Sequence, residues 1–316
     1  MVQIGTHIVA ESLQKQIGSR RAVMISSKPL FGIETIVVKE PVKTYENALF
    51  VIEQLIEKGC DRDTVLVGCG GGSVTDLTGF VGSIFLRGIS VILIPTTLLA
   101  MVDASIGGKN SIDTPFGKNL IGTFYLPENI IIDTAFLDTL PQKEWNHGMA
   151  EILKLGLVYD KELLLPASPL DLITKAVHGK LAITSVDFKD THLRRILNFG
   201  HTIGHALETG SGYAIPHGEA VALGCMTEAF FSYKLGYLDP LSFEKILSLY
   251  TSWKLPSTYC REKTMAALQK DKKNKGGNIR SVLIDAIGHA LAFNKEYCHP
   301  LPNTLILEGL SWLEKQ

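Results

Sequence analysis

Short apolar runs recur through the first part of the chain. Each run is rich in β-branched residues and almost wholly apolar, which is typical of parallel strands covered on both faces. The runs occupy residues 22–26, 35–38, 64–68, 90–95 and 129–133. Their length and composition predict five strands of one buried parallel sheet.

The segments between these runs carry apolar residues at helical spacing. A first predicted helix ends at Gly59 as its C′ residue, and its buried stripe is expected to comprise Leu49, Ile52, Leu55 and Ile56. A second helix is expected to begin near Ser73 and to carry Leu77 and Val81. Strand–helix–strand order of this kind predicts a doubly wound, Rossmann-like α/β domain with right-handed crossovers.

The pattern changes after about residue 140, where helical periodicity dominates. Residues 140–160, 170–187, 201–208 and 218–236 are predicted to be helical, and 280–285 is the one candidate strand. We therefore predict two domains, 1–141 and 142–316, of which the second is mostly α-helical. The lack of a long linker favours close packing of the domains around a cleft.

Composition narrows the possible partners. The 316 residues are 46% apolar and 20% charged, with a net charge of −1. The sequence pI of about 6.8 does not favour nucleic acid or an anionic membrane as a partner. No apolar stretch reaches the length of about 18 residues that a membrane span needs, and the N-terminal residues lack the order of a signal peptide. Five widely spaced cysteines argue against a disulfide framework and a thiolate zinc site, and favour a reducing cytoplasm.

A glycine-rich segment follows the third predicted strand. In VGCGGGSVTD, Val67–Asp76, a strand ends, glycines follow and a helix begins. Glycines allow the backbone to approach a phosphate, and a helix N-terminus presents unpaired N–H groups to it. Ser73 departs from the G-x-G-x-x-G fingerprint. The segment is therefore a candidate phosphate or nucleotide site, with a simple tight turn as the alternative.

A long polar segment, residues 95–122, follows the fourth predicted strand and is expected to be a loop. It lies at the carboxyl end of the sheet, where ligands bind in open α/β folds. Its polar residues suit a phosphorylated polyol and comprise Thr96, Thr97, Asp103, Lys109, Lys118 and Asn119. A loop of this length inside a compact domain is more often functional than idle, although solvated lysines on an ordinary loop are the alternative.

Two segments of the second domain suggest a metal site. In GMAEILK, Glu151 and Lys154 are helical neighbours in an apolar context, which makes Glu151 a plausible ligand. In the segment 198–224, His201 and His205 share a helix face and His217 follows. Histidine nitrogen and carboxylate oxygen are ligands of zinc and related ions. Spacing alone does not decide which histidines bind the metal, and a polar helix face is the alternative.

Taken together, these segments resemble the 3-dehydroquinate synthase family, sugar-phosphate cyclases of the shikimate pathway. The similar stretches stand in the family's order between about residues 64 and 236: GGGSVTDLTGF, RGISVILIPTTLLAMVDASIGGKNSIDTPFGKNLIG, LPQKEWNHGMAEILK and RRILNFGHTIGHALE…HGEAVALG. DKKNKGG at 271–277 is also similar to the family. The resemblance implies an NAD-binding α/β domain over 1–141 and a helical metal- and substrate-binding domain over 142–316.

The resemblance also implies roles for residues of the metal and substrate site. Glu151, His201 and His217 would hold zinc or cobalt, and His205 would transfer protons. Glu208 and Glu219 are interpreted as ordinary helix residues near the site. The expected contacts to the substrate or its phosphate are Asp103, Lys109, Asn119, Lys154, Lys180, Arg194, Asn198, Arg87 and one or both of Lys272 and Lys273.

The resemblance places NAD against the first domain. The expected NAD contacts are Gly71, Gly72, Ser73, Asp76, Thr96, Thr97, Lys118, Thr139, Glu40 and Lys43. The implied substrate is a phosphorylated sugar acid, 3-deoxy-D-arabino-heptulosonate 7-phosphate. The implied reaction gives 3-dehydroquinate and phosphate by transient oxidation by NAD, phosphate elimination, re-reduction, ring opening and intramolecular aldol closure. The family also suggests a homodimer.

Three alternatives remain open. The connection KPLFGIETI is shorter than in the family and lacks the acid expected near the adenosine ribose. An NAD-deficient, non-catalytic homologue is therefore one alternative. A sibling cyclase that makes an inosose, a valiolone or an amino-substituted product is a second, which the presence of Lys180, Asn198 and His205 disfavours. A metal-dependent alcohol dehydrogenase is the third, and the lysine-rich phosphate site argues against it.

Overall fold

The computed structural model describes residues 1–269, 278–294 and 296–316, which form two compact units. The first unit comprises Met1–Trp145 and Ser168–Leu181. The second comprises Asn146–Ala167 and Ala182–Gln316. Each unit has its own architecture, α/β in the first and mainly helical in the second.

The first unit is built on a six-stranded sheet in which every pairing is parallel. In sheet order the strands are β1 (Val2–Gly5), β8 (Asn129–Asp133), β5 (Val91–Pro95), β4 (Val65–Gly70), β2 (Ala22–Ser26) and β3 (Glu34–Val37). All five predicted strands are confirmed, within two residues at each end. The edge strand β1 was not predicted, because its four residues are only half-buried and carry no continuous apolar run.

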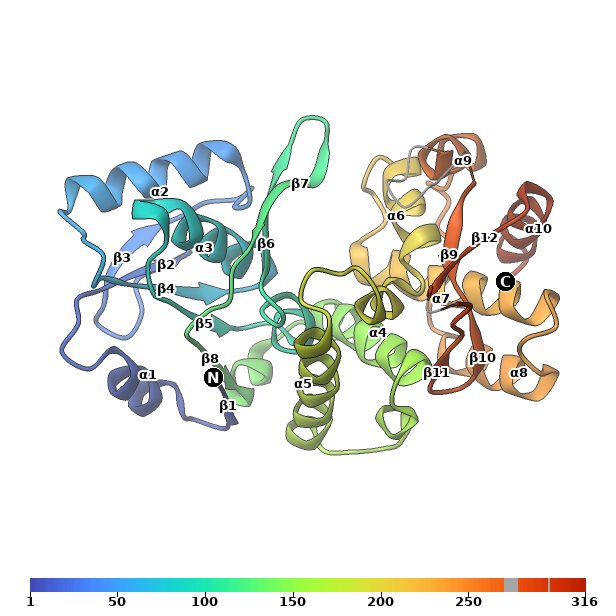
Figure 1. The fold of residues 1–316 in the computed structure, drawn as a ribbon, viewed down its shortest axis with the longest axis horizontal. Coiled ribbons are helices and arrows are strands. Elements are labelled where there is room, and N and C mark those ends of the chain that lie inside the picture. Colours follow the sequence, from blue (N-terminus) through green and yellow to red (C-terminus); the bar gives the residue numbers. More distant parts are fainter. Residues whose placement is uncertain (270–277, 295) are drawn as a thin grey trace. The chain divides into compact units, whose positions relative to one another are not determined.

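Helices cover both faces of this sheet, as a doubly wound fold requires. Figure 1 shows α2 (Tyr45–Glu57) and α3 (Gly72–Ile84) over one face and α1 (Val9–Ile17) over the other. Along β4, Leu66 packs with the α2 and α3 side chains, whereas Val65 and Val67 pack with those of α1. The alternation of side chains along a strand thus supplies both cores, and the predicted α/β fold class is confirmed.

The buried stripe predicted for α2 is partly wrong. Leu49 and Ile56 are 43% and 63% exposed, whereas Ala48, Val51 and Leu55 face the sheet. This helix carries apolar residues on more than one side, so periodicity alone fits two adjacent stripes. The sheet selects the stripe that contains the small Ala48. The other predicted features are confirmed: Gly59 follows the helix in a left-handed conformation (φ +64°), and α3 buries Leu77 and Val81.

The prediction of a loop over residues 95–122 is also wrong. A short π-helical turn, η2 (Ala100–Ala104), precedes an antiparallel hairpin of β6 (Lys109–Thr114) and β7 (Gly117–Phe124). The hairpin escaped sequence reasoning because only Asn110 and Ile112 of β6, and no residue of β7, are fully buried. The alternation that identifies a half-buried strand is therefore almost absent. Two 3-10 turns also lie in this unit, η1 (Phe85–Arg87) and η3 (Thr134–Thr139).

The second unit is mainly helical, as predicted. Four predicted helices are confirmed as α4 (Gln142–Val158), α5 (Pro169–Val186), α6 (His201–Gly210) and α7 (His217–Lys234). The first residues of α4 and most of α5 belong to the first unit. Sequence reasoning did not identify three further helices, α8 (Pro240–Leu249), α9 (Arg261–Gln269) and α10 (Asn303–Leu313). The 3-10 turns are η4 (Lys161–Leu164) and η5 (Leu193–Asn198).

The predicted strand at 280–285 is two short strands in different sheets. β9 (Arg280–Val282) pairs with β12 (Cys298–Pro300), and β10 (Ile284–Ala286) pairs with β11 (His289–Ala290). Within the residues that the structure describes, every helix is too short or too polar to cross a bilayer.

Candidate functional site

Glycines allow α6 and α7 to cross at very short range. A Cβ atom on Gly224 would lie 1.9 Å from the carbonyl oxygen of Gly200, and one on Gly204 would lie 3.0 Å from that of Ala220. Gly200 also adopts φ +78°, a left-handed conformation that suits glycine, as the residue before α6. The glycines of the sequence motif thus allow close packing of the two helices that begin with His201 and His217.

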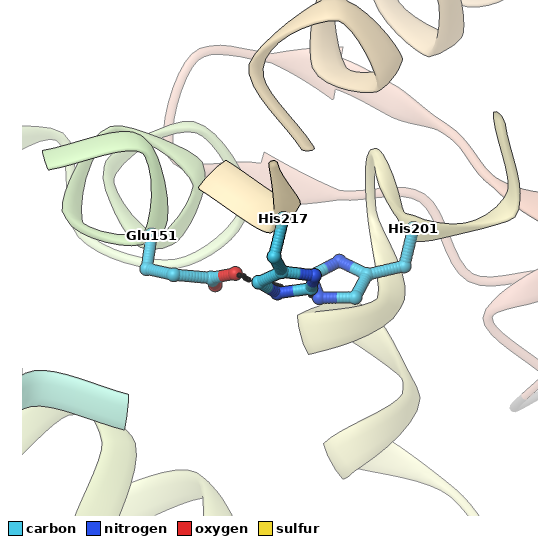
Figure 2. Close-up of side chains that lie close together, drawn as sticks. All are labelled: Glu151, His201 and His217. Atoms are coloured by element: carbon cyan, nitrogen blue, oxygen red, sulfur yellow. Dashed lines mark ion pairs between the residues drawn. The ribbon is translucent and has the colours of Figure 1, made fainter. Parts of the chain in front are cut away.

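Three side chains from three helices converge in the second unit. Figure 2 shows Glu151 of α4, His201 at the start of α6 and His217 at the start of α7 pointing toward one another. Glu151 Oε1 lies 3.5 Å from His201 Nε2 and 3.3 Å from His217 Nε2. One ligand atom from each residue lies within 4.8 Å of the other two. Two imidazoles and a carboxylate in this arrangement form a typical donor set for a catalytic zinc ion.

Both imidazoles are oriented through their Nδ1 atoms. His201 Nδ1 lies 3.2 Å from the carbonyl oxygen of Phe199, and His217 Nδ1 lies 3.2 Å from Glu208 Oε2. Because both partners are acceptors, each Nδ1 carries the hydrogen and donates it. The lone pair of a neutral ring is then on Nε2, the atom that faces Glu151. Metal-binding histidines usually have such a hydrogen-bond acceptor at the ring nitrogen that does not bind the metal.

Glu151 is a buried anion, with 3% of its surface exposed. Its Oε2 accepts a hydrogen bond from the Lys154 ammonium group, which is itself buried. Among the residues that the structure describes, Oε1 accepts no hydrogen bond. Burial raises the pKa of Glu151, but Lys154 and His217 outweigh burial and hold the pKa well below its usual range. A buried carboxylate oxygen without a hydrogen-bond donor fits a metal ion as its partner.

The charge around His217 also favours a cation. Burial lowers the pKa of His217, but the adjacent carboxylates of Glu151 and Glu208 outweigh burial and raise the pKa to about 10. The ring therefore takes up a proton when no metal ion is bound. A divalent cation between Nε2 and Glu151 Oε1 would supply the positive charge instead.

His205 lies beside this centre, one turn along α6. Its ring centroid is 5.2 Å from that of His201 and 6.0 Å from that of His217. His205, Glu208 and His217 form a second group whose ligand atoms lie within 4.8 Å of one another. Two possible ligand sets therefore share His217. The first has the buried carboxylate oxygen that accepts no hydrogen bond, whereas Glu208 Oε2 already accepts one.

In the first unit, the glycine-rich turn between β4 and α3 packs against the end of β5. β4 ends at Gly70, Gly71 is the N-cap, and α3 begins at Gly72. A Cβ atom on Gly71 would lie 3.3 Å from Thr97 Cγ2, and the Thr96 N–H donates to the Gly70 carbonyl at 2.9 Å. The turn, Thr96 and Thr97 thus lie together at the carboxyl ends of adjacent parallel strands, the usual place for a ligand.

A polar cluster lies beside this turn. The Lys43 ammonium group donates to Asp76 of α3 and to Asn119 of β7, whose side-chain oxygen also accepts from Ser111 Oγ at 2.8 Å. Burial raises the pKa of Asp76, and Lys43 offsets this only in part. Lys43 and Asp76 were assigned to NAD and Asn119 to the substrate, and the structure brings all three together. Glu40 lies nearby in the sequence and caps the turn by accepting from the Val42 N–H at 3.1 Å.

A second pair in the first unit joins two residues that were assigned to the substrate. The Lys180 ammonium group donates to the carboxylate of Asp103 and, at 2.6 Å, to its backbone carbonyl. Lys180 is buried, whereas the Asp103 side chain is 29% exposed. The pair therefore presents a carboxylate at the surface that is held in place by a buried cation.

Arg194 is buried and donates to the Phe188 carbonyl at 2.8 Å. The segment that carries it is organised by Asp187, whose carboxylate accepts from the N–H groups of Thr191, His192 and Arg194. Burial raises the pKa of Asp187, but these hydrogen bonds outweigh burial and lower the pKa to about 2. Sequence reasoning gave Asp187 no role, because its partners are backbone groups that have no sequence signature.

The remaining predicted site residues occupy the following positions in the fold. Lys109 begins β6, Lys118 lies in β7, Arg87 ends η1, Thr139 ends η3, and Asn198 ends η5. Ser73 lies in the first turn of α3. Lys272 and Lys273 lie outside the residues that the structure describes.

The interpretation of Glu208 as an ordinary helix residue is wrong. Its side chain is buried and contacts His217, although it was treated like the half-exposed Glu219. The sequence carried a usable signal, because Glu208 follows His205 by three positions and His201 by seven. All three side chains therefore share one face of α6.

The chain matches two family models that together span most of its length. One is described as the 3-dehydroquinate synthase N-terminal domain and covers residues 34–147, and the other as the C-terminal domain and covers residues 148–274. The 3-dehydroquinate synthase of Thermodesulfovibrio yellowstonii is 41% identical, over 90% of this chain and 88% of that protein.

Solved structures of two cyclases have the same fold. A 2-deoxy-scyllo-inosose synthase complexed with carbaglucose-6-phosphate, NAD+ and Co2+ superposes with a TM-score of 0.87 at 26% identity, covering 97% of this chain and 95% of that one. The 2-epi-5-epi-valiolone synthase of Streptomyces hygroscopicus subsp. jinggangensis, with NAD+ and Zn2+ bound, gives 0.87 at 26% identity, covering 100% and 96%.

Proposed function

Since this chain belongs to the 3-dehydroquinate synthase family, we propose that it converts 3-deoxy-D-arabino-heptulosonate 7-phosphate to 3-dehydroquinate and phosphate. It is an NAD- and metal-dependent lyase. The convergence of Glu151, His201 and His217, with an Oε1 atom that accepts no hydrogen bond, is the observation that supports this function best. The supply of cationic side chains for an anionic substrate supports it further.

The metal ion, zinc or cobalt, would bind to Glu151 Oε1 and to the Nε2 atoms of His201 and His217. Three protein ligands leave a position for substrate hydroxyl groups, and the ion supplies Lewis acidity there. The Lys154 ammonium group holds Glu151 Oε2, so the carboxylate offers Oε1 alone to the ion. Lys154 thereby fixes the direction of the ligand, and we propose that it also contacts the substrate.

NAD supplies the hydride acceptor and donor and is regenerated in each turnover. We assign its pyrophosphate to the turn that contains Gly71, Gly72 and Ser73, because the first N–H groups of α3 point out of the helix there. The residues expected around the rest of NAD are Thr96, Thr97, Lys118, Thr139, Glu40, Lys43 and Asp76. The domain over residues 1–141 is thus the proposed NAD-binding domain, and 142–316 the metal- and substrate-binding domain.

The substrate is a phosphorylated acid and needs cations at two places. Arg87, Lys109 and Arg194 are proposed to bind its anionic groups, together with one or both of Lys272 and Lys273. The Asp103–Lys180 pair, Asn119 and Asn198 are proposed to bind its hydroxyl and carboxylate groups. His205 is proposed to move protons, because its ring lies beside the ligands but belongs to the second group rather than the first.

A sibling cyclase is the second candidate, since both cyclase structures share the fold at 26% identity. The higher identity of 41% to a 3-dehydroquinate synthase favours the first candidate.

One assay separates the candidates. The purified protein is incubated with the heptulosonate phosphate, NAD and Zn²⁺ or Co²⁺, and phosphate, carbocycle and NADH are measured. We expect phosphate and dehydroquinate in equal amounts, with no net NADH. Turnover of another sugar phosphate alone would assign a sibling cyclase, and net NADH from a simple polyol would assign a dehydrogenase. If the protein neither turns over a substrate nor binds NAD, it would be assigned as a non-catalytic homologue.

We further propose that the enzyme works in the cytoplasm as a homodimer. None of the five cysteines, all within the described residues, forms a disulfide, which suits a reducing compartment. Size-exclusion chromatography with light scattering measures the oligomeric state directly.

A further inference from the structure

We propose that Glu208 is a positioning residue for the metal centre. Its carboxylate accepts the Nδ1 hydrogen of His217 and thereby presents Nε2, rather than Nδ1, to the metal ion. The inference rests on the proposed function, because it concerns the same ion. It adds a residue outside the proposed set of ligands and explains how that set is selected over the second group of His205, Glu208 and His217.

The imidazole of His217 lies between two carboxylates, one at each nitrogen. Nε2 is 3.3 Å from Glu151 Oε1, and Nδ1 is 3.2 Å from Glu208 Oε2. Either nitrogen of an imidazole can bind a metal ion, and the hydrogen bond made by the other nitrogen decides which one does. A neutral His217 that donates from Nδ1 to Glu208 leaves its lone pair on Nε2, facing Glu151.

Glu208 is well placed to impose this choice. Only 4% of its surface is exposed, so water competes weakly for the Nδ1 hydrogen. The segment that leads to His217 is also hydrogen-bonded to the backbone of Glu208. The Glu208 carbonyl accepts from the Tyr213 N–H at 2.7 Å and from Ser211 Oγ at 2.9 Å, and Ser211 Oγ accepts in turn from the Ile215 N–H at 3.1 Å.

His201 and His217 differ in the kind of group that orients them. His201 donates from Nδ1 to the backbone carbonyl of Phe199, which no side-chain substitution removes. His217 depends on a carboxylate side chain for the same purpose. Substitution of Glu208 can therefore change the orientation of His217 without altering a proposed ligand.

The test is Glu208→Gln, which keeps the shape of the side chain but removes its charge and lets the amide group turn its NH2 toward Nδ1. Glu219→Gln is the matched control, because this half-exposed glutamate lies in the first turn of α7, two residues from His217. Affinities for Zn²⁺ and Co²⁺ are measured by chelator competition. The Co²⁺ absorption spectrum and the ¹⁵N shifts of the His217 ring in the Zn²⁺-bound protein are recorded for each variant.

We expect Glu208→Gln to bind Zn²⁺ about 10–100-fold more weakly, as is usual when the outer partner of a ligating histidine is lost. We also expect its Co²⁺ spectrum to change and its His217 ring to lose the pure Nδ1-protonated form. Glu219→Gln should match the wild type in all three measurements. The melting temperature of each metal-free variant shows whether folding is intact, and the ring shifts report on orientation even where stability falls.

Unchanged affinity, spectrum and ring shifts in Glu208→Gln would overturn the proposal. The proposal would also be overturned if Glu208→Gln lost the metal while Glu151→Gln retained it, because Glu208 would then be a ligand in the second group. A wild-type protein that binds neither ion would instead refute the metal centre of the proposed function, and the two failures are therefore distinguishable.

Discussion

The substitution Gly224→Ala tests whether the crossing of α6 and α7 sets the ligand geometry. A Cβ atom at this position would lie 1.9 Å from the Gly200 carbonyl oxygen and 2.9 Å from the Gly204 backbone nitrogen. Side-chain carbons do not approach backbone atoms closer than 3.0 Å, so the first distance must grow from 1.9 Å to at least that value. Because both neighbours are backbone atoms, the helices themselves must separate by about an ångström.

Two consequences follow from this separation. Overpacking of a close contact costs about 1–3 kcal/mol, and the gain in helix propensity from glycine to alanine returns about 1 kcal/mol, so we expect a net loss of up to about 2 kcal/mol. His201 begins one helix and His217 the other, so their Nε2 atoms move apart as well. Metal–ligand distances tolerate changes of only about 0.2 Å, and metal affinity should fall by roughly tenfold or more.

The assay combines urea unfolding of the metal-free protein with chelator competition for Zn²⁺. Gly309→Ala is the control, since its Cβ would lie 2.3 Å from the Phe231 ring, at a contact between α10 and α7 away from the ligands. We expect both variants to be destabilised but only Gly224→Ala to lose metal affinity. Equal Zn²⁺ affinity in Gly224→Ala and Gly309→Ala would show that the helix crossing does not set the ligand geometry.

Three further predictions concern single side chains. His201→Ala should lose bound metal and activity together, whereas His205→Ala should retain the metal, measured by atomic absorption, and turn over slowly; equal metal loss would contradict the assignment. Asp187 has its pKa lowered to about 2, so it stabilises the fold above about pH 4, and this contribution is lost as the pH falls from about 4 to 2. Asp187→Asn should therefore cost about 1–2 kcal/mol in urea unfolding at pH 7 and almost nothing at pH 2, and a cost independent of pH would argue against this cause. Lys43→Met leaves the partly buried Asp76 without its cation, so NAD should bind at least about tenfold more weakly by calorimetry; unchanged affinity would remove Lys43 from the NAD site.

The sequence specified the parts of the fold that repeat a simple pattern. Buried parallel strands are continuous apolar runs, and five of the six were found with nearly correct ends. Where the apolar pattern was ambiguous, the prediction from sequence was wrong. The α2 helix is apolar on several sides, so only its packing on the sheet shows that Ala48 rather than Leu49 faces inward. The exposed hairpin of β6 and β7 buries too little to show alternation.

The site was predictable to the extent that chemistry fixes residue types. The motifs offered Glu151 and three histidines as candidate ligands without choosing between the histidines. The resemblance to the family implied Glu151, His201 and His217, and the structure brings these three together. The supporting groups were harder to find, because their partners are distant in sequence or belong to the backbone. Glu208 acts on a histidine nine residues away across a turn, and Asp187 accepts from backbone N–H groups. Such roles depend on the position of the residue in the tertiary structure. Helical spacing in the sequence indicates this position for Glu208, but no sequence pattern indicates it for Asp187.

We propose above that NAD is reduced and reoxidised within one catalytic cycle, so that no NAD is consumed. The most direct measurement counts the dehydroquinate molecules formed per NAD molecule, with the Zn²⁺-loaded enzyme, limiting NAD and excess heptulosonate phosphate, while NADH absorbance is followed. We expect many product molecules per NAD and no accumulation of NADH. Formation of one NADH for each product molecule, or product formation that stops when NAD has been consumed once, would contradict it.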